Sequence, residues 1–184
     1  MNGAATTTTL PWQGHVTREA DREVLGFGER AGNVIGIAFI IFFVTVLFYL
    51  QGRGYIFSSK FSSLDAVLLY GSILYGIIPN VVRTVTTRRN LGRLFDIIGS
   101  LIFLVVGTYL LTKFPFHFND LYLILPDSVQ NGFSWFNDAV FRFLFEIALF
   151  VTAIGAVYMT VMYVLVRNEL KRRTRPVSGE RRTA

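Results

Sequence analysis

Four long apolar runs without a charged residue constrain this chain more than any other feature. They cover residues 33–50, 66–82, 97–112 and 147–166, and none of them contains Asp, Glu, Lys or Arg. With 18, 17, 16 and 20 residues, each run approaches the length that a helix needs to cross a hydrocarbon layer about 30 Å thick. Lipid offers no water to backbone N–H and C=O groups, so a crossing segment satisfies them by forming a helix. The runs therefore predict an all-α, polytopic membrane protein with a four-transmembrane-helix bundle.

The connections between the runs are short, which predicts the domain organisation. We expect a cytoplasmic lead with an N-terminal amphipathic interfacial helix over residues 1–31, a four-helix transmembrane domain over 32–166 and a basic cytoplasmic tail over 167–184. The spans are expected at about 33–50, 64–83, 93–112 and 143–166, and an aromatic external loop at 113–138. Because aromatic side chains gather where the chain is half in water and half in lipid, we expect the rings of this loop along the outer membrane interface. A chain of 184 residues divided in this way has no room for a separate soluble domain.

The distribution of basic residues predicts the orientation of the spans. Lys and Arg number 3 in residues 1–31, 4 in 83–93 and 7 in 167–184, against 2 in 51–63 and 2 in 113–142. Basic flanks resist translocation, so the side with 14 of these residues should be cytoplasmic and the side with 4 external. We therefore expect an integral, multi-pass protein with cytoplasmic N- and C-termini. Its basic tail should also contact anionic lipid of the bilayer.

The segment before the first run carries a helical pattern of apolar side chains. After a flexible lead over residues 1–15, one helical face collects Val16, Ala20, Val24, Phe27 and Ala31. This spacing predicts a short amphipathic helix on the inner membrane surface. Its polar face holds three Arg against four Asp and Glu, which makes a weak electrostatic lipid anchor and favours contact with another protein.

Ionisable residues near the spans are the candidate polar sites, because a charge at the centre of a membrane helix costs at least about 2.5 kcal/mol. Asp96 lies about one turn into the third span and three positions after Arg93, so it is within reach of Arg93 and we expect it to extend toward the cytoplasmic arginines. Arg142 and Glu146 are four positions apart on one helix face, at the outer boundary of the fourth span. The carboxylates of Asp96 and Glu146 should therefore lie at opposite membrane surfaces.

Two further polar features mark the second span. Ser62 and Asp65 have the spacing of a capping box, which predicts that a helix begins there and that Asp65 has a structural role. Asn80 is the remaining candidate polar site. The preceding Pro79 removes a helical hydrogen bond and predicts a kink within this span.

Small residues recur at helical spacing in all four runs. In lipid, such residues let helix backbones approach closely, which is how membrane helices associate. The predicted packing positions are Gly32, Gly36, Ser72, Gly76, Gly99, Gly107, Ala148, Thr152, Ala156 and Thr160.

Nothing in the sequence predicts catalytic chemistry. The chain has no Cys, which excludes thiolate metal sites, and its two histidines, His15 and His117, lie outside the apolar runs. Phosphate-binding, zinc-protease and serine-hydrolase motifs are absent. We therefore expect no catalytic, cofactor-binding or metal-binding residues and no enzymatic activity. A nucleic-acid partner is also not expected, because the basic tail lacks interleaved aromatic residues.

These observations favour a non-catalytic integral membrane protein. We expect an accessory or scaffold subunit that self-associates or docks on a larger membrane complex through its packing positions and its outer loop. The alternative is a small ion channel or transporter with a narrow polar path, gated by Asp96 at one mouth and by Arg142 and Glu146 at the other.

The orientation can be tested with single cysteines, because the natural chain contains none. A membrane-impermeant thiol reagent applied from outside should label Ser62→Cys and Asn119→Cys. It should not label Thr6→Cys or Ser178→Cys, because the basic flanks keep those segments inside. Labelling of either terminal cysteine in intact cells would overturn the predicted orientation.

Overall fold

The computed structural model describes residues 11–119 and 135–174, with Pro126, Ser128, Gln130 and Gly132 between them. In this part of the chain the regular structure is helical, apart from two isolated bridges. The helices are α1 (Pro11–Asp21), α2 (Phe27–Arg53), α3 (Ser63–Tyr75), α4 (Ile77–Thr86), α5 (Arg89–Lys113) and α7 (Asp138–Thr174). Four helical stretches are long and apolar enough to cross a membrane, and α3 and α4 together form one of them. The predicted all-α membrane fold is confirmed.

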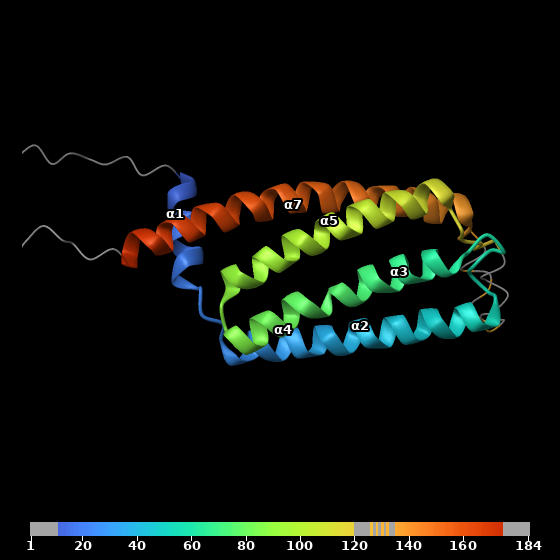
Figure 1. Cartoon of the computed structure of the whole chain (residues 1–184), viewed down its shortest axis with the longest axis horizontal. Helices are drawn as coiled ribbons and strands as arrows, with labels where there is room; N and C mark the ends of the chain where they lie inside the picture. The colour runs from blue at the N-terminus through green and yellow to red at the C-terminus, as the bar shows by residue number, and fades with distance from the viewer. Residues whose placement is uncertain are drawn as a thin grey trace, which may run out of the picture.

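The long helices lie side by side and alternate in direction (Figure 1). One end of the molecule, which we call the terminal end, holds the starts of α2 and α5 and the ends of α4 and α7. The opposite end, the loop end, holds the ends of α2 and α5 and the starts of α3 and α7. Helix α1 crosses α7 near the C-terminus of that helix, at the terminal end (Figure 1).

The helices are longer than the apolar runs that predicted them. Helix α2 begins after Gly26, whose backbone N–H donates to Glu29 at 3.2 Å, and ends before Gly54, whose φ of 72° few other residues adopt readily. Helix α7 has 37 residues and is therefore about 55 Å long. This length exceeds the roughly 40–45 Å of a whole bilayer with its headgroups, so part of α7 extends beyond the membrane.

The second span is broken where Pro79 predicted a kink. Gly76 separates α3 from α4, and the buried Pro79 has no N–H to donate to the preceding turn. The Asn80 side chain also bonds at this break, because its Nδ2 donates to the carbonyl of Gly76 at 2.8 Å. A Cβ on Gly76 would lie 3.2 Å from Ile40 Cδ1, so the break also lies against α2.

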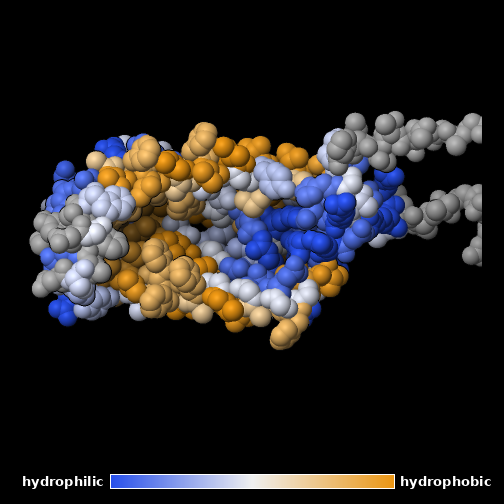
Figure 2. Space-filling view, turned by 180° about the vertical axis from the view of Figure 1, so that it is seen from behind, coloured by the Kyte–Doolittle hydropathy of each residue, from blue (hydrophilic) through white to orange (hydrophobic). Residues whose placement is uncertain are grey.

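The helices pack in a row, in the order α2, then α3 and α4, then α5, then α7. No Cα atom of α2 lies within 8 Å of a Cα atom of α7, and both helices are described over their full length. The row is therefore not closed into a ring. Seen from behind, the molecule is hollowed between these two helices (Figure 2). We call this open side the α2–α7 cleft.

The amphipathic segment before α2 differs from its prediction. Helix α1 begins at Pro11 and ends at Asp21, so it starts within the expected flexible lead and does not continue to Ala31. Val16 and Ala20 are buried against Met162 and Val166 of α7, as a helical face would allow.

Beyond α1, the predicted apolar face is wrong. The chain leaves the helix and pairs with the α4–α5 turn, where Leu25 donates to the Thr87 carbonyl at 2.9 Å and Arg89 donates to the Glu23 carbonyl at 2.9 Å. This extended pairing turns Val24 and Phe27 outward, and both are exposed. The helical period fails here because these tertiary backbone hydrogen bonds replace helical ones.

Several predicted packing positions lie at close helix contacts. A Cβ on Gly36 would lie 3.6 Å from Asn80, one on Gly99 3.0 Å from the Tyr75 ring and one on Gly107 2.5 Å from Leu149. Gly32 differs from these positions, because it is exposed and its Cβ position has no neighbour within 4 Å.

The predicted stripe on α7 does not form one packed face. Ala156 is buried and Thr152 partly buried, whereas Ala148 and Thr160 are exposed. An i to i+4 step rotates about 40° around a helix of 3.6 residues per turn, so the ends of a four-membered stripe point about 120° apart. The buried residues of α7 are Leu149, Ala156, Met162 and Val166.

The described part of the aromatic loop also differs from its prediction. We expected its rings along the membrane interface, but Phe116 and Phe118 are buried. They pack with Ile56, and Phe118 stacks on Phe141 with ring centroids 4.0 Å apart. Stacking buries most of the surface of each ring, whereas a ring at the membrane interface would stay half exposed. Trp135 remains exposed, and residues 120–125, 127, 129, 131, 133 and 134 lie outside the described residues.

Ala156 and Ala148 lie on the same helix but differ in exposure, so the same substitution at both positions tests the packing. Ala156 is 7% exposed, so Ala156→Leu should overpack its contact and lower the free energy of unfolding by about 1–3 kcal/mol. Ala148→Leu makes the same change at an exposed site and should stay within about 0.5 kcal/mol of the wild type. Unfolding in detergent measures both. Equal destabilisation by the two variants would contradict the observed packing.

Candidate functional site

Charged and polar residues from four separate segments gather at the terminal end. We call this cluster the polar lattice. Its members come from α1, the α1–α2 connection, α4 and α5, and are Glu19, Glu23, Arg83, Arg89, Asn90, Arg93 and Asp96. Figure 2 shows hydrophilic residues on this half of the cleft face.

Asp96 pairs with Arg83 of α4, one of the arginines toward which it was expected to extend, and not with the nearer Arg93 of its own helix. The two side chains are about one-fifth exposed and connect neighbouring antiparallel helices. Gly92 makes room for this pair, because a Cβ there would collide with the Arg83 side chain. Asp96 therefore contacts an arginine of the neighbouring helix in preference to the arginine three positions before it on its own helix.

Arg93 instead pairs with Glu19 of α1. Arg89 lies 3.9 Å from the same carboxylate and pairs with Glu29 of α2. Burial alone would raise the pKa of Glu19, but the hydrogen bond and charge of Arg93, with the charge of Arg89, lower it below its usual range. Glu19 is therefore ionised at neutral pH and holds α1 against the start of α5.

Glu23 lies at the N-terminus of α5, and its pKa is shifted in the direction opposite to that of Glu19. Both of its carboxylate oxygens accept from the backbone N–H of Asn90, at 3.1 and 3.2 Å. A carboxylate here satisfies an otherwise unpaired N–H group and meets the positive end of the helix dipole. Burial still raises the pKa of Glu23, and the hydrogen bond from Asn90 offsets it only in part.

Some buried polar atoms of this region have no hydrogen-bond partner. They are Arg30 Nε, Asn33 Nδ2, Asn90 Oδ1 and Arg93 Nη1. Three of the four are donors. Unpartnered buried donors are rare because desolvating them costs about 1–3 kcal/mol each.

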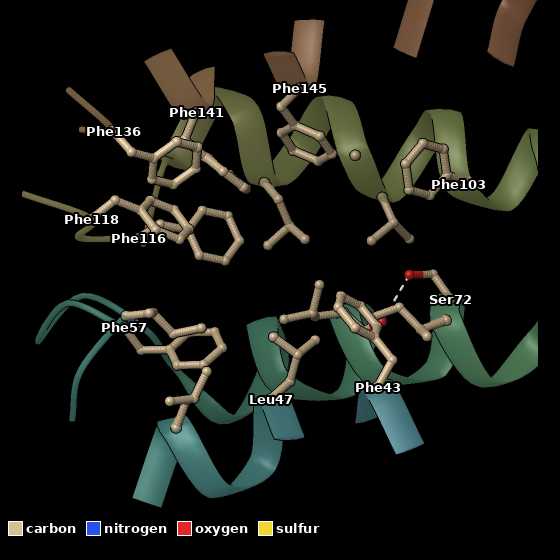
Figure 3. A pocket seen from close by; sticks show the side chains of 17 residues that line it. Phe43, Leu47, Phe57, Ser72, Phe103, Phe116, Phe118, Phe136, Phe141 and Phe145 are labelled. Atoms are coloured by element: carbon tan, nitrogen blue, oxygen red, sulfur yellow. Dashed lines mark hydrogen bonds between the residues drawn. The ribbon is translucent and has the colours of Figure 1, made fainter. Parts of the chain in front are cut away.

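The loop-end half of the molecule contains an apolar cavity of about 410 Å³. It is lined by Phe43, Leu47, Leu50, Ile56, Phe57, Leu69, Ser72, Ile73, Phe103, Val106, Gly107, Leu110, Phe116, Phe118, Phe136, Phe141 and Phe145. Figure 3 shows Phe43 and Leu47 of α2 across the cavity from Phe103 and Phe145, with Phe116 and Phe118 at one end. Ser72, a predicted packing position, therefore lines a space.

The cavity offers almost no free polar group to an occupant. Among the described lining residues, Ser72 alone has a side-chain hydroxyl, and it donates to the Leu69 carbonyl at 2.8 Å (Figure 3). The other lining residues are apolar. The volume falls within the roughly 300–1,000 Å³ of small-molecule sites, so the cavity suits an apolar group of that size.

A buried carboxylate lies at the loop end. Asp65 is 0% exposed and accepts from Lys113 Nζ at 2.5 Å, from the Tyr109 hydroxyl at 3.0 Å and from the Ser62 backbone N–H at 2.7 Å. The predicted capping box is confirmed. The contacts with Tyr109 and Lys113 were missed, although these residues lie four apart at the end of the helix that runs antiparallel to α3.

This loop-end cluster lacks the features of a nucleophilic site. Ser62 Oγ lies 3.3 Å from Lys113 Nζ, as a serine nucleophile would from a lysine base. However, Asp65 holds Lys113 in its ammonium form and also accepts the Ser62 hydroxyl at 2.8 Å. The lysine is therefore not available as a base, and the cluster joins α3 to α5.

The remaining predicted polar pair is weakly coupled. Arg142 Nε lies 3.9 Å from Glu146 Oε1, and both side chains are about half exposed. The Arg142 guanidinium also lies 5.5 Å from the ring centre of Phe114. Asp96 and Glu146 lie toward opposite ends of the molecule, so no single site brings these two carboxylates together.

Two carboxylates with different burial give a contrast in stability. Asp65→Asn keeps an oxygen for the cap but leaves Lys113 without its counter-charge, so it should cost about 3 kcal/mol, the low end for a buried ion pair, because Lys113 reaches solvent. Glu146→Gln removes a half-exposed charge and should cost less than about 1 kcal/mol. Unfolding in detergent should rank them in this order; the reverse order would contradict the role assigned to Asp65.

Neither a protein-family model, a curated protein nor a solved structure matches this chain. The assignment of function therefore rests on the geometry and chemistry of the polar lattice, the cavity and the ends of the helices.

Proposed function

We propose that this chain is a non-catalytic integral membrane protein that serves as an accessory or scaffold subunit. It docks on a larger membrane complex, or on a second copy of itself, through a helical platform formed by α1 and by the last turns of α7 from Val166 to Thr174. Both termini are cytoplasmic in this proposal, which places the platform on the cytoplasmic side. The excess of Lys and Arg in the segments at the terminal end supports this orientation.

The observation that carries the proposal is the way α1 is fixed across α7. Val16 and Ala20 are buried against Met162 and Val166, which lie in the part of α7 nearest its C-terminus. Met162 lies in the last turns of the apolar run 147–166 and Val166 ends it, so α1 is fixed where α7 leaves the hydrocarbon. Helix α1 and the charged turns of α7 that follow Val166 form a rigid surface at this boundary.

Ion pairs add to this fixation and leave basic side chains free on the surface. Arg173 Nη1 lies 2.7 Å from Asp21 of α1, and Glu19 pairs with Arg93 of α5. Exposed residues of the platform include Trp12, Arg18 and Lys171. Trp and Arg are the residue types most enriched at energetically important interface positions. The exposed charge favours a partner with an acidic surface.

A small ion channel or transporter is the second candidate. The polar lattice favours it, because charged side chains between helices can line the mouth of a path. The cavity disfavours it, because an ion leaving the lattice toward the loop end would meet a space with an apolar lining. Asp96 would gate one mouth and the Arg142 and Glu146 pair the other.

The scaffold proposal predicts that exposed platform residues determine the mass of the isolated assembly. Wild-type protein extracted in native nanodiscs should exceed the 20.8 kDa of one chain. Combining Trp12→Ala with Arg18→Glu should weaken the assembly by at least about 30-fold, the effect of losing one hot-spot residue of about 2 kcal/mol. Trp135→Ala is the matched control, because Trp135 is similarly exposed but lies at the loop end.

Light scattering and cross-linking of the three proteins decide the outcome. A wild type that is monomeric in native membranes, or an assembly that responds equally to both tryptophan variants, would overturn the scaffold proposal. Ion flux into liposomes containing only the purified wild type, altered in selectivity by Asp96→Asn or Glu146→Gln, would replace it with the channel.

A further inference from the structure

The apolar cavity is too large to be an ordinary packing defect of the bundle. Its volume is about 410 Å³, whereas the interiors of folded proteins contain few voids larger than a water molecule. Helices α2 and α3 form one wall of the cavity, and α5 and α7 form the other (Figure 3). Each lining atom that faces empty space loses the dispersion contacts that a neighbour would supply. A space of this size is therefore unfavourable unless an occupant fills it.

The lining determines the polarity of that occupant. A buried water needs about two to four polar partners, and a cavity lined by Leu, Ile and Phe stays dry. Among the described lining residues, Ser72 has the one side-chain hydroxyl, which already donates to the Leu69 carbonyl. A polar group of a ligand would lose its hydrogen bonds on entering, which costs free energy. The occupant is therefore a hydrocarbon.

The volume distinguishes a hydrocarbon chain from the helix of a partner. One turn of an α-helix with its side chains is about 10–12 Å wide and about 5.4 Å tall, which corresponds to about 420–610 Å³. The whole cavity is smaller than this turn, so a partner's transmembrane helix does not fit inside it. A cavity of about 150 Å³ binds benzene, so 410 Å³ provides room for about 16 carbon atoms. This is the size of one acyl chain.

The cavity also lies at the depth of acyl chains. Its lining extends from Phe43 to Leu50 on α2 and from Phe103 to Leu110 on α5, and both stretches belong to the uncharged apolar runs. Over each stretch the helix rises about 10 Å, which is less than the roughly 15 Å of hydrocarbon in one leaflet. The cavity therefore fits within the leaflet at the loop end.

The opening between α2 and α7 provides a route into the cavity. Phe43 of α2 and Phe145 of α7 both line it, although no Cα atoms of these two helices lie within 8 Å of each other. Figure 2 shows the hollow between the two helices with hydrophobic residues toward the loop end. We propose that the cavity binds one acyl chain of a lipid from the leaflet at the loop end, which enters sideways through the α2–α7 cleft. This inference does not depend on the platform or its partner.

The first experiment locates the chain. Phosphatidylcholine with a photoreactive diazirine near the end of one acyl chain is added to nanodiscs that contain the purified protein, and the cross-linked peptides are identified by mass spectrometry. Cross-links should form at lining residues such as Phe103 and Val106 and saturate at one lipid per chain. Val105 and Phe150 are exposed and report ordinary contact with the bilayer, which should not saturate. Cross-links at exposed residues alone would overturn the proposal.

The second experiment changes the size of the site. Val106 lines the cavity and is buried, whereas Val105 is exposed on the same helix. Val106→Phe fills the space of about four carbon atoms, so the preferred chain should shorten from palmitoyl to lauroyl, and retention of the palmitoyl lipid should fall at least about fivefold. Val105→Phe makes the same change toward lipid and should alter neither quantity. Native mass spectrometry of the lipids retained from nanodiscs of mixed lauroyl, palmitoyl and arachidoyl phosphatidylcholines measures both.

A second variant keeps this test valid if Val106→Phe lowers the melting temperature of the protein. Ser72→Leu narrows the cavity from the opposite wall and should also favour shorter chains. An unchanged chain preference in every variant that melts within a few degrees of the wild type would falsify the proposal. Cross-links from the cavity lining to a co-purified polypeptide would also contradict it, because a side chain of a partner would then fill the space.

Discussion

Ion pairs between helices fix the centre of this molecule, and the other elements depend on them. Arg83 and Asp96 join α4 to α5 at the terminal end, and Asp65 and Lys113 join α3 to α5 at the loop end. A charge next to lipid is tolerated only when it is paired or reaches the interface, so each pair fixes the register of two antiparallel helices. The broken second span can therefore keep its place beside α5, although its backbone hydrogen bonding is interrupted at Pro79.

The outer helices are held differently, which explains the open side. Helix α2 packs on α3 and α4, and α7 packs on α5, but the described ion pairs include none between α2 and α7. Cross-connections occur only at the two ends. At the terminal end α1 joins α7 to α5, and at the loop end Phe116 and Phe118 pack between Ile56 and Phe141. The middle of the cleft is left without a protein partner.

The sequence predicted what depends on neighbouring residues and missed what depends on helix order. The apolar runs predicted the spans, and the spacing of Ser62 and Asp65 predicted the cap, because both are local. The sequence directed Asp96 toward the cytoplasmic arginines but did not distinguish Arg83 from Arg93, since it does not show which helix lies beside α5. Thr160 was predicted at a packing position but is exposed, because positions four apart drift around a helix. Phe116 was expected at the interface but is buried, because the rings that it packs against are distant in sequence. The cleft itself required knowing that α2 and α7 do not meet.

A hollow within a membrane differs in energetics from one in water. Lipid chains are as apolar as the lining of the cavity, so a chain gains little hydrophobic free energy by moving from the bilayer into it. Selectivity by polarity among occupants of the hollow must therefore come from its hydrophilic half, which lies toward the terminal end. The cavity contributes by shape, because Phe43 and Phe145 limit what can lie beside them. A lateral opening suits this division, since a lipid can enter along the membrane plane without exposing its chain to water.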